Sequence, residues 1–154
     1  MTDKWGPPTW NFLHTIAEKI KDEEYPRIGT ELVNYIVRII NYLPCPDCSK
    51  HASDYINKRV PPYKFQTKEG LKEVLYYLHN YVNTRTNKPT PGIEILNRYK
   101  QKYTANDVVN TFNMFARVYN TKGNMNFIME SYHRNRLMNE LKQWIMLNIK
   151  SFSE

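Results

Sequence analysis

The sequence contains few cysteines, few glycines and no long apolar run. Cys45 and Cys48 are the only cysteines among its 154 residues, which excludes a secreted scaffold held by several disulfides. No run of about eighteen apolar residues occurs, which excludes a helical membrane span. The N-terminus lacks a basic start followed by an apolar segment, and no Asn-x-Ser/Thr site occurs, so we expect no signal peptide and a cytosolic setting.

The charge balance is basic but dispersed. The net charge is +7, from 22 basic and 15 acidic residues, and a chain of this length is expected to form one globular unit. The basic residues are scattered along the chain and form neither a tail nor a compact block. Because a solvated surface explains such a distribution, we predict no specific nucleic-acid partner.

Helical spacing dominates the apolar pattern. Apolar residues recur every three or four positions along nearly the whole chain, and no segment alternates with period two over more than a few residues. An all-α protein is therefore predicted. The first helix is expected to begin at Pro7-Pro8, the second to cover residues 30–43 and the third residues 46–58. The fourth is expected to begin after Thr67. The short, proline-marked connections between them indicate a four-helix up-and-down bundle.

The last third of the chain adds further helical segments. A short helix is expected around residues 93–103, and residues 104–154 are predicted to be a helical pair appended to a domain of residues 1–103. Thr104 and Asp107 are spaced as a capping box at the start of this pair. The expected apolar stripes consist of Val108, Phe112, Phe115 and Tyr119, and, after a turn at residues 121–124, of Ile128, Tyr132, Leu137, Leu141, Trp144 and Ile145. These stripes predict that the pair packs on the first domain.

Cys45 and Cys48 form a C-x-x-C motif where a helix is predicted to begin. The free N–H groups and the positive dipole end of a helix N-terminus favour the thiolate form, which indicates redox chemistry. Because His51 follows three residues later, a zinc site of Cys45, Cys48 and His51 is the competing interpretation. No second cysteine pair offers a fourth ligand, so we predict no metal. A zinc-stabilised helical adaptor or nucleic-acid-binding protein stays the alternative function.

Aromatic and polar residues share helix faces in three segments. The residues that share a face are Trp10 with His14, Cys48 with His51 and Tyr55, and His79 with Asn83. Taken singly, each histidine or tryptophan is more typical of an ordinary core or surface position. Three histidines on the inner faces of adjacent helices, however, require a ligand or other partners for their polar atoms.

These ordered segments resemble the Erv/ALR family of FAD-linked sulfhydryl oxidases, most closely the short versions encoded by large cytoplasmic DNA viruses. The similarity covers roughly residues 4–103 and rests on three motifs in the same order: W-G-P-P-T-W-N-F-L-H, L-P-C-P-D-C-S-K-H with Tyr55 following, and H-N-Y-V-N-T-R-T-N-K-P. It implies that the four-helix bundle, with a short fifth helix, holds FAD. The residues that the resemblance places at the flavin nucleotide are Gly6, Trp10, His14, Asp47, His51, Tyr55, His79, Val82, Asn83, Lys88, Arg98 and Tyr99.

The resemblance also implies an activity. Electrons pass from the dithiol of a protein substrate through a Cys45–Cys48 disulfide to FAD and then to dioxygen, which gives hydrogen peroxide. In this assignment Cys45 is the interchange cysteine that meets the substrate, and Cys48 is the cysteine next to the flavin. Because family members are usually dimers, a homodimer is expected.

Two departures from the family pattern change these expectations. Many relatives carry a second, mobile cysteine pair, which this chain lacks, so it is expected to accept electrons directly or through a thioredoxin-like relay protein. Pro7 stands where the family often has arginine, which removes one expected phosphate contact. The viral resemblance implies a location at virus assembly sites in the host cytoplasm and in the virion, without a membrane partner.

Overall fold

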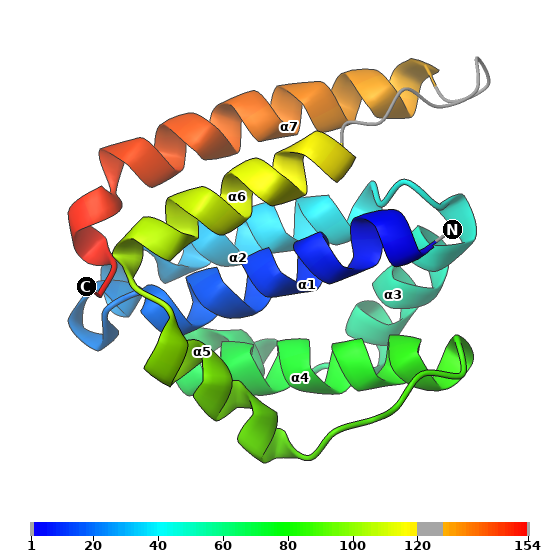
Figure 1. Ribbon diagram of the computed structural model, residues 1–154, viewed down its shortest axis with the longest axis horizontal. Helices are drawn as coiled ribbons and strands as arrows, with labels where there is room; N and C mark the ends of the chain where they lie inside the picture. Colours follow the sequence, from blue (N-terminus) through cyan, green and yellow to red (C-terminus); the bar gives the residue numbers. More distant parts are fainter. Residues whose placement is uncertain (1, 120–127, 154) are drawn as a thin grey trace.

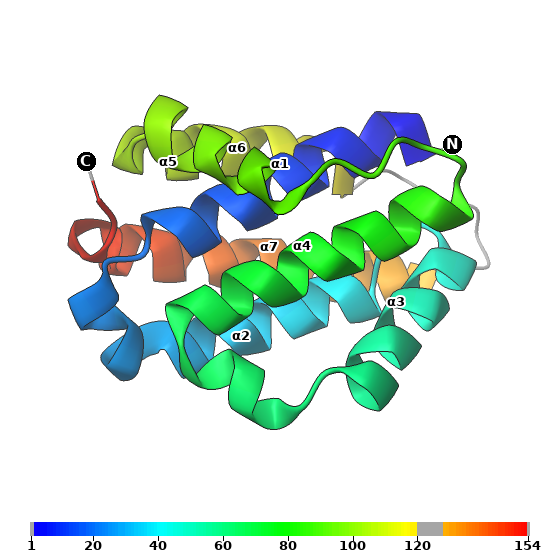
Figure 2. The same cartoon turned by 90° about the horizontal axis from the view of Figure 1, so that it is seen from below.

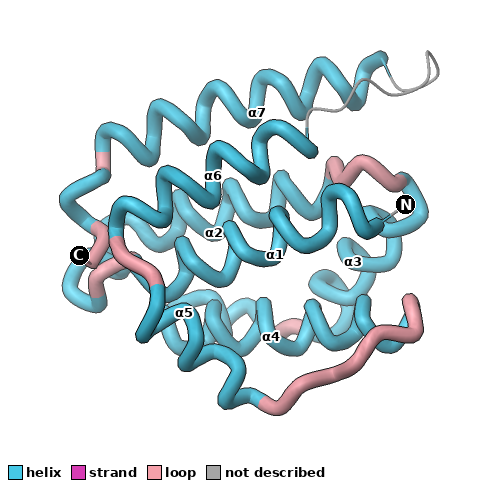
Figure 3. The backbone as a smooth tube through the Cα atoms, in the orientation of Figure 1, coloured by secondary structure: helices cyan, strands magenta, loops and turns pink. Residues whose placement is uncertain are grey.

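The computed structural model describes residues 2–119 and 128–153, and most of this part is helical (Figures 1 and 3). Its α-helices are α1 (Thr2–Lys19), α2 (Tyr25–Asn41), α3 (Pro46–Arg59), α4 (Lys68–Arg85), α5 (Asn97–Lys102), α6 (Ala105–Tyr119) and α7 (Ile128–Leu147). The predicted all-α class is confirmed. Within the two described ranges, no helix is long and apolar enough to cross a membrane.

The predicted starts of α4 and α6 are confirmed by their caps. The Thr67 hydroxyl accepts a hydrogen bond from the N–H of Gly70 at 3.0 Å. At α6, the Asp107 carboxylate accepts the N–H of Thr104 at 2.7 Å, which is the bond that the second residue of a capping box accepts. Each bond satisfies a backbone N–H that no carbonyl of the helix can reach.

The predicted start of α1 is wrong. The helix begins at Thr2, five residues before Pro7, so that Pro7 and Pro8 lie inside it. A proline has no N–H, so the carbonyl groups of residues 3 and 4 lose their helical donors. The helix tolerates this loss because both carbonyl groups lie in its first turn, where Lys4 is exposed to water.

The predicted start of α2 is also wrong. A 3₁₀ turn at Asp22–Glu24 leads directly into the helix, which begins at Tyr25 rather than near residue 30. Pro26 lies in its first turn, where a missing N–H leaves no helical bond unmade. The chain therefore passes from α1 to α2 through one short turn.

The helices pack around α1 and α2. Helix α4 packs against both, and α3 contacts α2 and α4. Figure 2 shows α3 at the end of the molecule where α4 ends. Helix α6 runs along α1, and α7 contacts α2 and α6 as the outermost helix in Figure 1. This arrangement leaves α1 between α4 and α6.

Aromatic rings join α6 to the first four helices. The ring of Phe12 on α1 stacks on that of Phe115, with 5.1 Å between centroids, and meets the ring of Phe112 edge-on at 5.5 Å. Tyr119 is fully buried, and its hydroxyl donates to the carbonyl oxygen of Ile39 on α2 at 3.0 Å. Residues after 103 therefore share one hydrophobic core with the earlier helices. The division of the chain at residue 103 stays a prediction.

The apolar stripe of α7 is confirmed over its second half and is wrong at Tyr132. The buried members of the stripe are Leu137, Leu141, Trp144 and Ile145. Tyr132 is 61% exposed, because five residues separate it from Leu137 and place it on another face of the helix. The turn predicted at residues 121–124 and the side chain of Ile128 lie outside the described residues.

Replacement of Phe115 by alanine tests the shared core. We expect Phe115→Ala to lower the free energy of unfolding by about 3–5 kcal/mol, because it empties a fully buried site between α1 and α6. Met114 is the neighbouring residue on α6 and is 58% exposed, so Met114→Ala is expected to change stability by about 0.5 kcal/mol or less. Urea unfolding measures both values. Equal effects of the two variants would contradict the shared core.

Candidate active site

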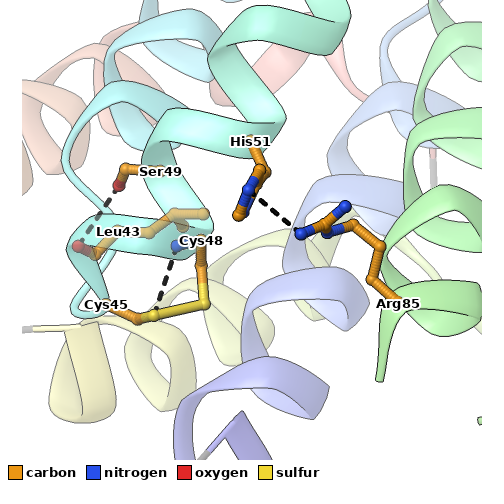
Figure 4. The surroundings of a disulfide bond; sticks show 6 residues. All are labelled: Leu43, Cys45, Cys48, Ser49, His51 and Arg85. Carbon is orange, nitrogen blue, oxygen red and sulfur yellow. Dashed lines mark hydrogen bonds between the residues drawn. A yellow bond between two sulfur atoms is a disulfide. The ribbon is translucent and has the colours of Figure 1, made fainter. Parts of the chain in front are cut away.

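A disulfide lies at the start of α3. Cys45 and Cys48 are bonded to each other, with 5.2 Å between their Cα atoms. Cys45 is the extended residue before the helix, and its sulfur accepts the N–H of Cys48 at 3.2 Å (Figure 4). Pro46 follows at the first helical position, where its missing N–H leaves no bond unmade. The predicted start of α3 is confirmed, and both cysteines are half-buried, which leaves part of each in contact with solvent.

The position of the disulfide favours its opening by a thiolate. When a disulfide is attacked, one sulfur leaves with a negative charge. The N-terminal end of a helix stabilises negative charge through its free N–H groups and its dipole. Here the Cys48 N–H already points at the sulfur of Cys45, so negative charge on this sulfur has a donor in place.

His51 and Tyr55 follow Cys48 along one face of α3 and contact α4. The Arg85 guanidinium donates to Nε2 of His51 at 3.0 Å (Figure 4). The ring of Tyr55 lies 4.8 Å from that of Tyr81, measured between centroids. These contacts hold the Cys48 face of α3 against the last turns of α4.

A cavity of about 340 Å³ lies between α1, the end of α4 and α5. Its lining consists of Trp5, Gly6, Pro7, Trp10, Asn11, His79, Val82, Asn83, Thr86, Lys88, Arg98 and Tyr99. Eight of these twelve were predicted as site residues. Trp5, Asn11 and Thr86 were not predicted as site residues, and Pro7 was predicted only as a departure from the family pattern. A signal for two of them is present in the sequence, since Thr86 is four residues after Val82 and Asn11 is four after Pro7.

Aromatic rings form one wall of this cavity. The indole of Trp10 stacks on the imidazole of His79, with 4.2 Å between centroids and 8° between the ring planes. His14 lies behind this wall, where its Nε2 is hydrogen-bonded to Nδ1 of His79 at 3.0 Å. The ring of Tyr99 from α5 lies 5.0 Å from that of His14. Trp10 and His14 of α1 thus fix the orientation of His79, and Tyr99 of α5 packs on His14.

Burial keeps both imidazoles neutral. Burial and, to a smaller extent, the nearby His79 lower the pKa of His14 from 6.5 to about 3. Burial and, to a smaller extent, the Lys88 ammonium lower the pKa of His79 to about 4. Between two neutral rings, one nitrogen of the hydrogen bond donates and the other accepts. The wall is therefore uncharged at neutral pH.

The end of α4 carries Lys88 to the cavity. Asn87 follows the helix with a positive φ of 58°, a conformation that asparagine adopts more easily than most residues. The chain reverses there, and the N–H of Lys88 donates to the carbonyl oxygen of Asn83 at 2.8 Å. This Schellman-type ending holds Lys88 beside the buried Asn83 in the cavity lining.

Four predicted site residues lie outside this lining. His14 is buried behind it, and Asp47 is exposed in the first turn of α3. His51 and Tyr55 lie between α3 and α4, where they contact Arg85 and Tyr81. Contact of these four residues with a cofactor stays a prediction.

The structure does not support the competing zinc interpretation. The two sulfurs are bonded to each other, and Nε2 of His51 accepts from Arg85. In the part of the chain that the structure describes, no three His, Cys, Asp or Glu side chains form a group that could hold a metal ion.

Comparisons with known proteins point to one family. A model of the Erv1 / Alr family matches residues 7–104. Protein 096R of Invertebrate iridescent virus 3, whose name describes an FAD-linked sulfhydryl oxidase, is 33% identical over 99 residues, which cover 62% of this chain and 66% of that protein. The FAD-linked sulfhydryl oxidase of African swine fever virus is 33% identical over 84 residues, 54% of this chain and 69% of that protein.

A plant relative is also similar. The FAD-linked sulfhydryl oxidase ERV1 of Oryza sativa subsp. japonica is 32% identical over 87 residues, which cover 54% of this chain and 42% of that protein. The match thus spans about two thirds of the length of the viral relatives and less than half of the plant one. No solved structure matches the chain.

The neutral pair of histidines predicts a loss of stability on acidification. Below pH 6.5 the unfolded chain binds protons at both imidazoles, whereas the folded chain keeps them neutral down to about pH 4. The free energy of unfolding should therefore be highest above pH 6.5 and fall as the pH drops from 6.5 towards 4, by about 2 kcal/mol per histidine at pH 5. Urea unfolding at pH 7 and pH 5 measures the loss.

His79→Gln is the informative variant for this prediction. It removes one of the two titrating imidazoles, so its loss of stability between pH 7 and pH 5 should be smaller than that of the parent protein. Equal stability of the parent at both pH values would show that the pair is not held neutral.

Proposed function

We propose that this chain, which belongs to the Erv1 / Alr family, is an FAD-dependent sulfhydryl oxidase that converts pairs of thiols in protein substrates to disulfides, with dioxygen as the final acceptor and hydrogen peroxide as a product. One observation carries the proposal. The Cys45–Cys48 disulfide lies at the start of α3, and the face of α3 that carries Cys48 packs against the last turns of α4. Those same turns contribute Val82, Asn83 and Thr86 to the aromatic cavity.

The lining of the cavity fits a flavin nucleotide. Trp10 and His79 offer flat faces to an aromatic ring, and Lys88 and Arg98 offer positive charge to a diphosphate. Asn83 is buried, so its amide can pair with polar ring atoms away from water. The residues that we propose to hold FAD lie in the lining, behind it and on α3. They are Gly6, Trp10, His79, Val82, Asn83, Lys88, Arg98 and Tyr99 in the lining, His14 behind it, and Asp47, His51 and Tyr55 on α3.

The cysteine pair carries out the thiol chemistry in two exchanges. A substrate thiolate attacks the sulfur of Cys45, the Cys45–Cys48 bond breaks, and Cys48 leaves as a thiolate. The second substrate thiolate then attacks the substrate sulfur of the mixed disulfide. Cys45 leaves with its negative charge next to the Cys48 N–H, and the substrate leaves with a new disulfide.

The two exchanges transfer two electrons to the cysteine pair and release the protons of two substrate thiols. When bound, FAD supplies the acceptor for these electrons and their transfer to dioxygen. The contacts of His51 and Tyr55 with α4 keep Cys48 on the side of α3 that faces the cavity-lining turns. Cys45 is then the cysteine that meets the substrate.

The partners follow from the same assignment. The sequence contains no other cysteine, so the substrate dithiol, or a thioredoxin-like relay protein, reaches Cys45 itself. We further propose that residues 1–103 form the FAD-binding domain, that residues 104–154 are an extension packed on it, and that the protein is a homodimer. Its viral relatives support a location at virus assembly sites in the host cytoplasm and in the virion.

Purified protein should be yellow, with flavin absorbance that survives gel filtration. Cys48→Ser is expected to abolish oxygen consumption with dithiothreitol while FAD stays bound, because this variant cannot form the disulfide and yet keeps the cavity lining intact. Asn57→Ala, on an exposed part of α3, should leave both properties unchanged. A colourless protein that cannot be reconstituted with FAD, or a Cys48→Ser variant that still turns over, would refute the proposal.

A further inference from the structure

A second cavity lies on the other side of the disulfide. It has a volume of about 290 Å³ and lies between the link from α2 to α3, the first turns of α3, and the start of α7. Pro44 and Pro46, the two neighbours of Cys45 in the chain, both line it. It shares no lining residue with the cavity between α1, α4 and α5. We call this second cavity the Cys45 cleft.

The two cavities lie on opposite sides of α3. Ser49, Lys50 and Ser53 line the Cys45 cleft, and their spacing places them on one face of the helix. Cys48 and His51 lie on the other face, towards α4. In Figure 4, Leu43 and Ser49 lie to the left of His51 and Arg85, and the disulfide lies below them at the left. The Cys45 cleft is therefore on the side of α3 that faces away from the proposed FAD site.

Arg134 of α7 lines the Cys45 cleft and is 4% exposed. Its Nε has no hydrogen-bond partner, and its Nη2 donates to the Ser131 hydroxyl at 3.1 Å. No carboxylate among the described residues lies within ion-pair distance of its guanidinium. A buried cation without a counter-charge is unfavourable, and so is an unpaired buried N–H. Although Glu130 also lines the Cys45 cleft, no negative group among the described residues is paired with Arg134 there.

The other charges of the cleft leave it positive. Lys50 lines it from α3 and Glu130 from α7, so Arg134 and Lys50 together exceed the single negative charge by one. The ammonium of Lys50 lies 3.7 Å from the Asp54 carboxylate, but this pair is exposed and therefore weak. Lys50 can consequently turn towards an anion in the cleft.

We propose that the Cys45 cleft binds an acidic side chain, Asp or Glu, that neighbours the reactive cysteine of the dithiol substrate. This inference rests on the proposed thiol oxidase function. A substrate thiolate that attacks Cys45 brings its own neighbouring residues over Pro44 and Pro46, and hence over the cleft. A carboxylate matches the planar fork of a guanidinium and can accept two parallel hydrogen bonds from it.

Two short dithiol peptides test the proposal. They have the same length and cysteine spacing and differ only in Asp or Asn beside the first cysteine. Oxygen uptake by the FAD-loaded protein gives kcat and KM for each. We expect a KM about tenfold lower for the Asp peptide at low salt, with kcat unchanged, because a hydrogen bond between charged groups contributes about 1.5 kcal/mol. The ratio of the Asn-peptide KM to the Asp-peptide KM should fall as salt is added.

Charge-changing variants locate the effect. Lys50→Gln and Arg134→Gln should move the ratio of the Asn-peptide KM to the Asp-peptide KM towards one. Glu130→Gln should increase this ratio, because the substitution removes the repelling carboxylate. Lys50 and Glu130 are not buried, so these two variants carry the test even if Arg134→Gln does not fold. Lys142→Gln removes a positive charge from an exposed part of α7 and should leave the ratio unchanged.

The outcomes distinguish this inference from the proposed function. If dithiothreitol is oxidised normally and the two peptides have equal KM values, the acidic preference is refuted and the oxidase function stands. A preference that Lys50→Gln and Glu130→Gln leave unchanged would refute the cleft as its source. A preference that Lys142→Gln removes equally well would assign it to the net charge of the protein and also refute the cleft. Loss of all thiol oxidation and of flavin binding would overturn both.

Discussion

The enclosure of α1 is the constraint on which the rest of the structure depends. Every residue from Phe12 to Ile20 is buried, so each side of this stretch must be matched by a neighbour. The ring of Phe12 is covered by α6, and the imidazole of His14 is covered by α4 and α5. The carboxylate of Glu18 is paired with Lys72 at 2.6 Å, because an isolated charge would be too unfavourable in this position.

The cavity that we propose to hold FAD lies where this enclosure ends. The part of α1 that lines the cavity is the first half of the helix, before the fully buried stretch begins at Phe12. The His14–His79 hydrogen bond lies at this boundary and joins the core to the cavity wall. A neutral imidazole pair is suited to this role, since it gives a defined orientation without placing a charge in the core.

The start of α3 links the disulfide to both sides of the molecule. One face of the helix carries Cys48 towards α4 and the aromatic cavity, and the other carries Ser49 and Lys50 towards α7. In the proposed function, electrons leave through the first face, and in the further inference the substrate is recognised on the second. The C-terminal helices then contribute to substrate choice as well as to the core, because Arg134 of α7 lines the second cavity.

Local patterns determined the parts of this protein that depend on residues within one helical turn. The capping at Cys45-Pro46 and at Thr67, the buried stripe through Phe115, and the ordered motifs of the site were all readable in the sequence. Only the tertiary structure decided which side chains line each cavity. It places the ring of Tyr55 against that of Tyr81, and it buries Arg134. The physical reason is that burial and lining depend on how helices distant in the chain pack against one another, and no spacing within a single helix records this.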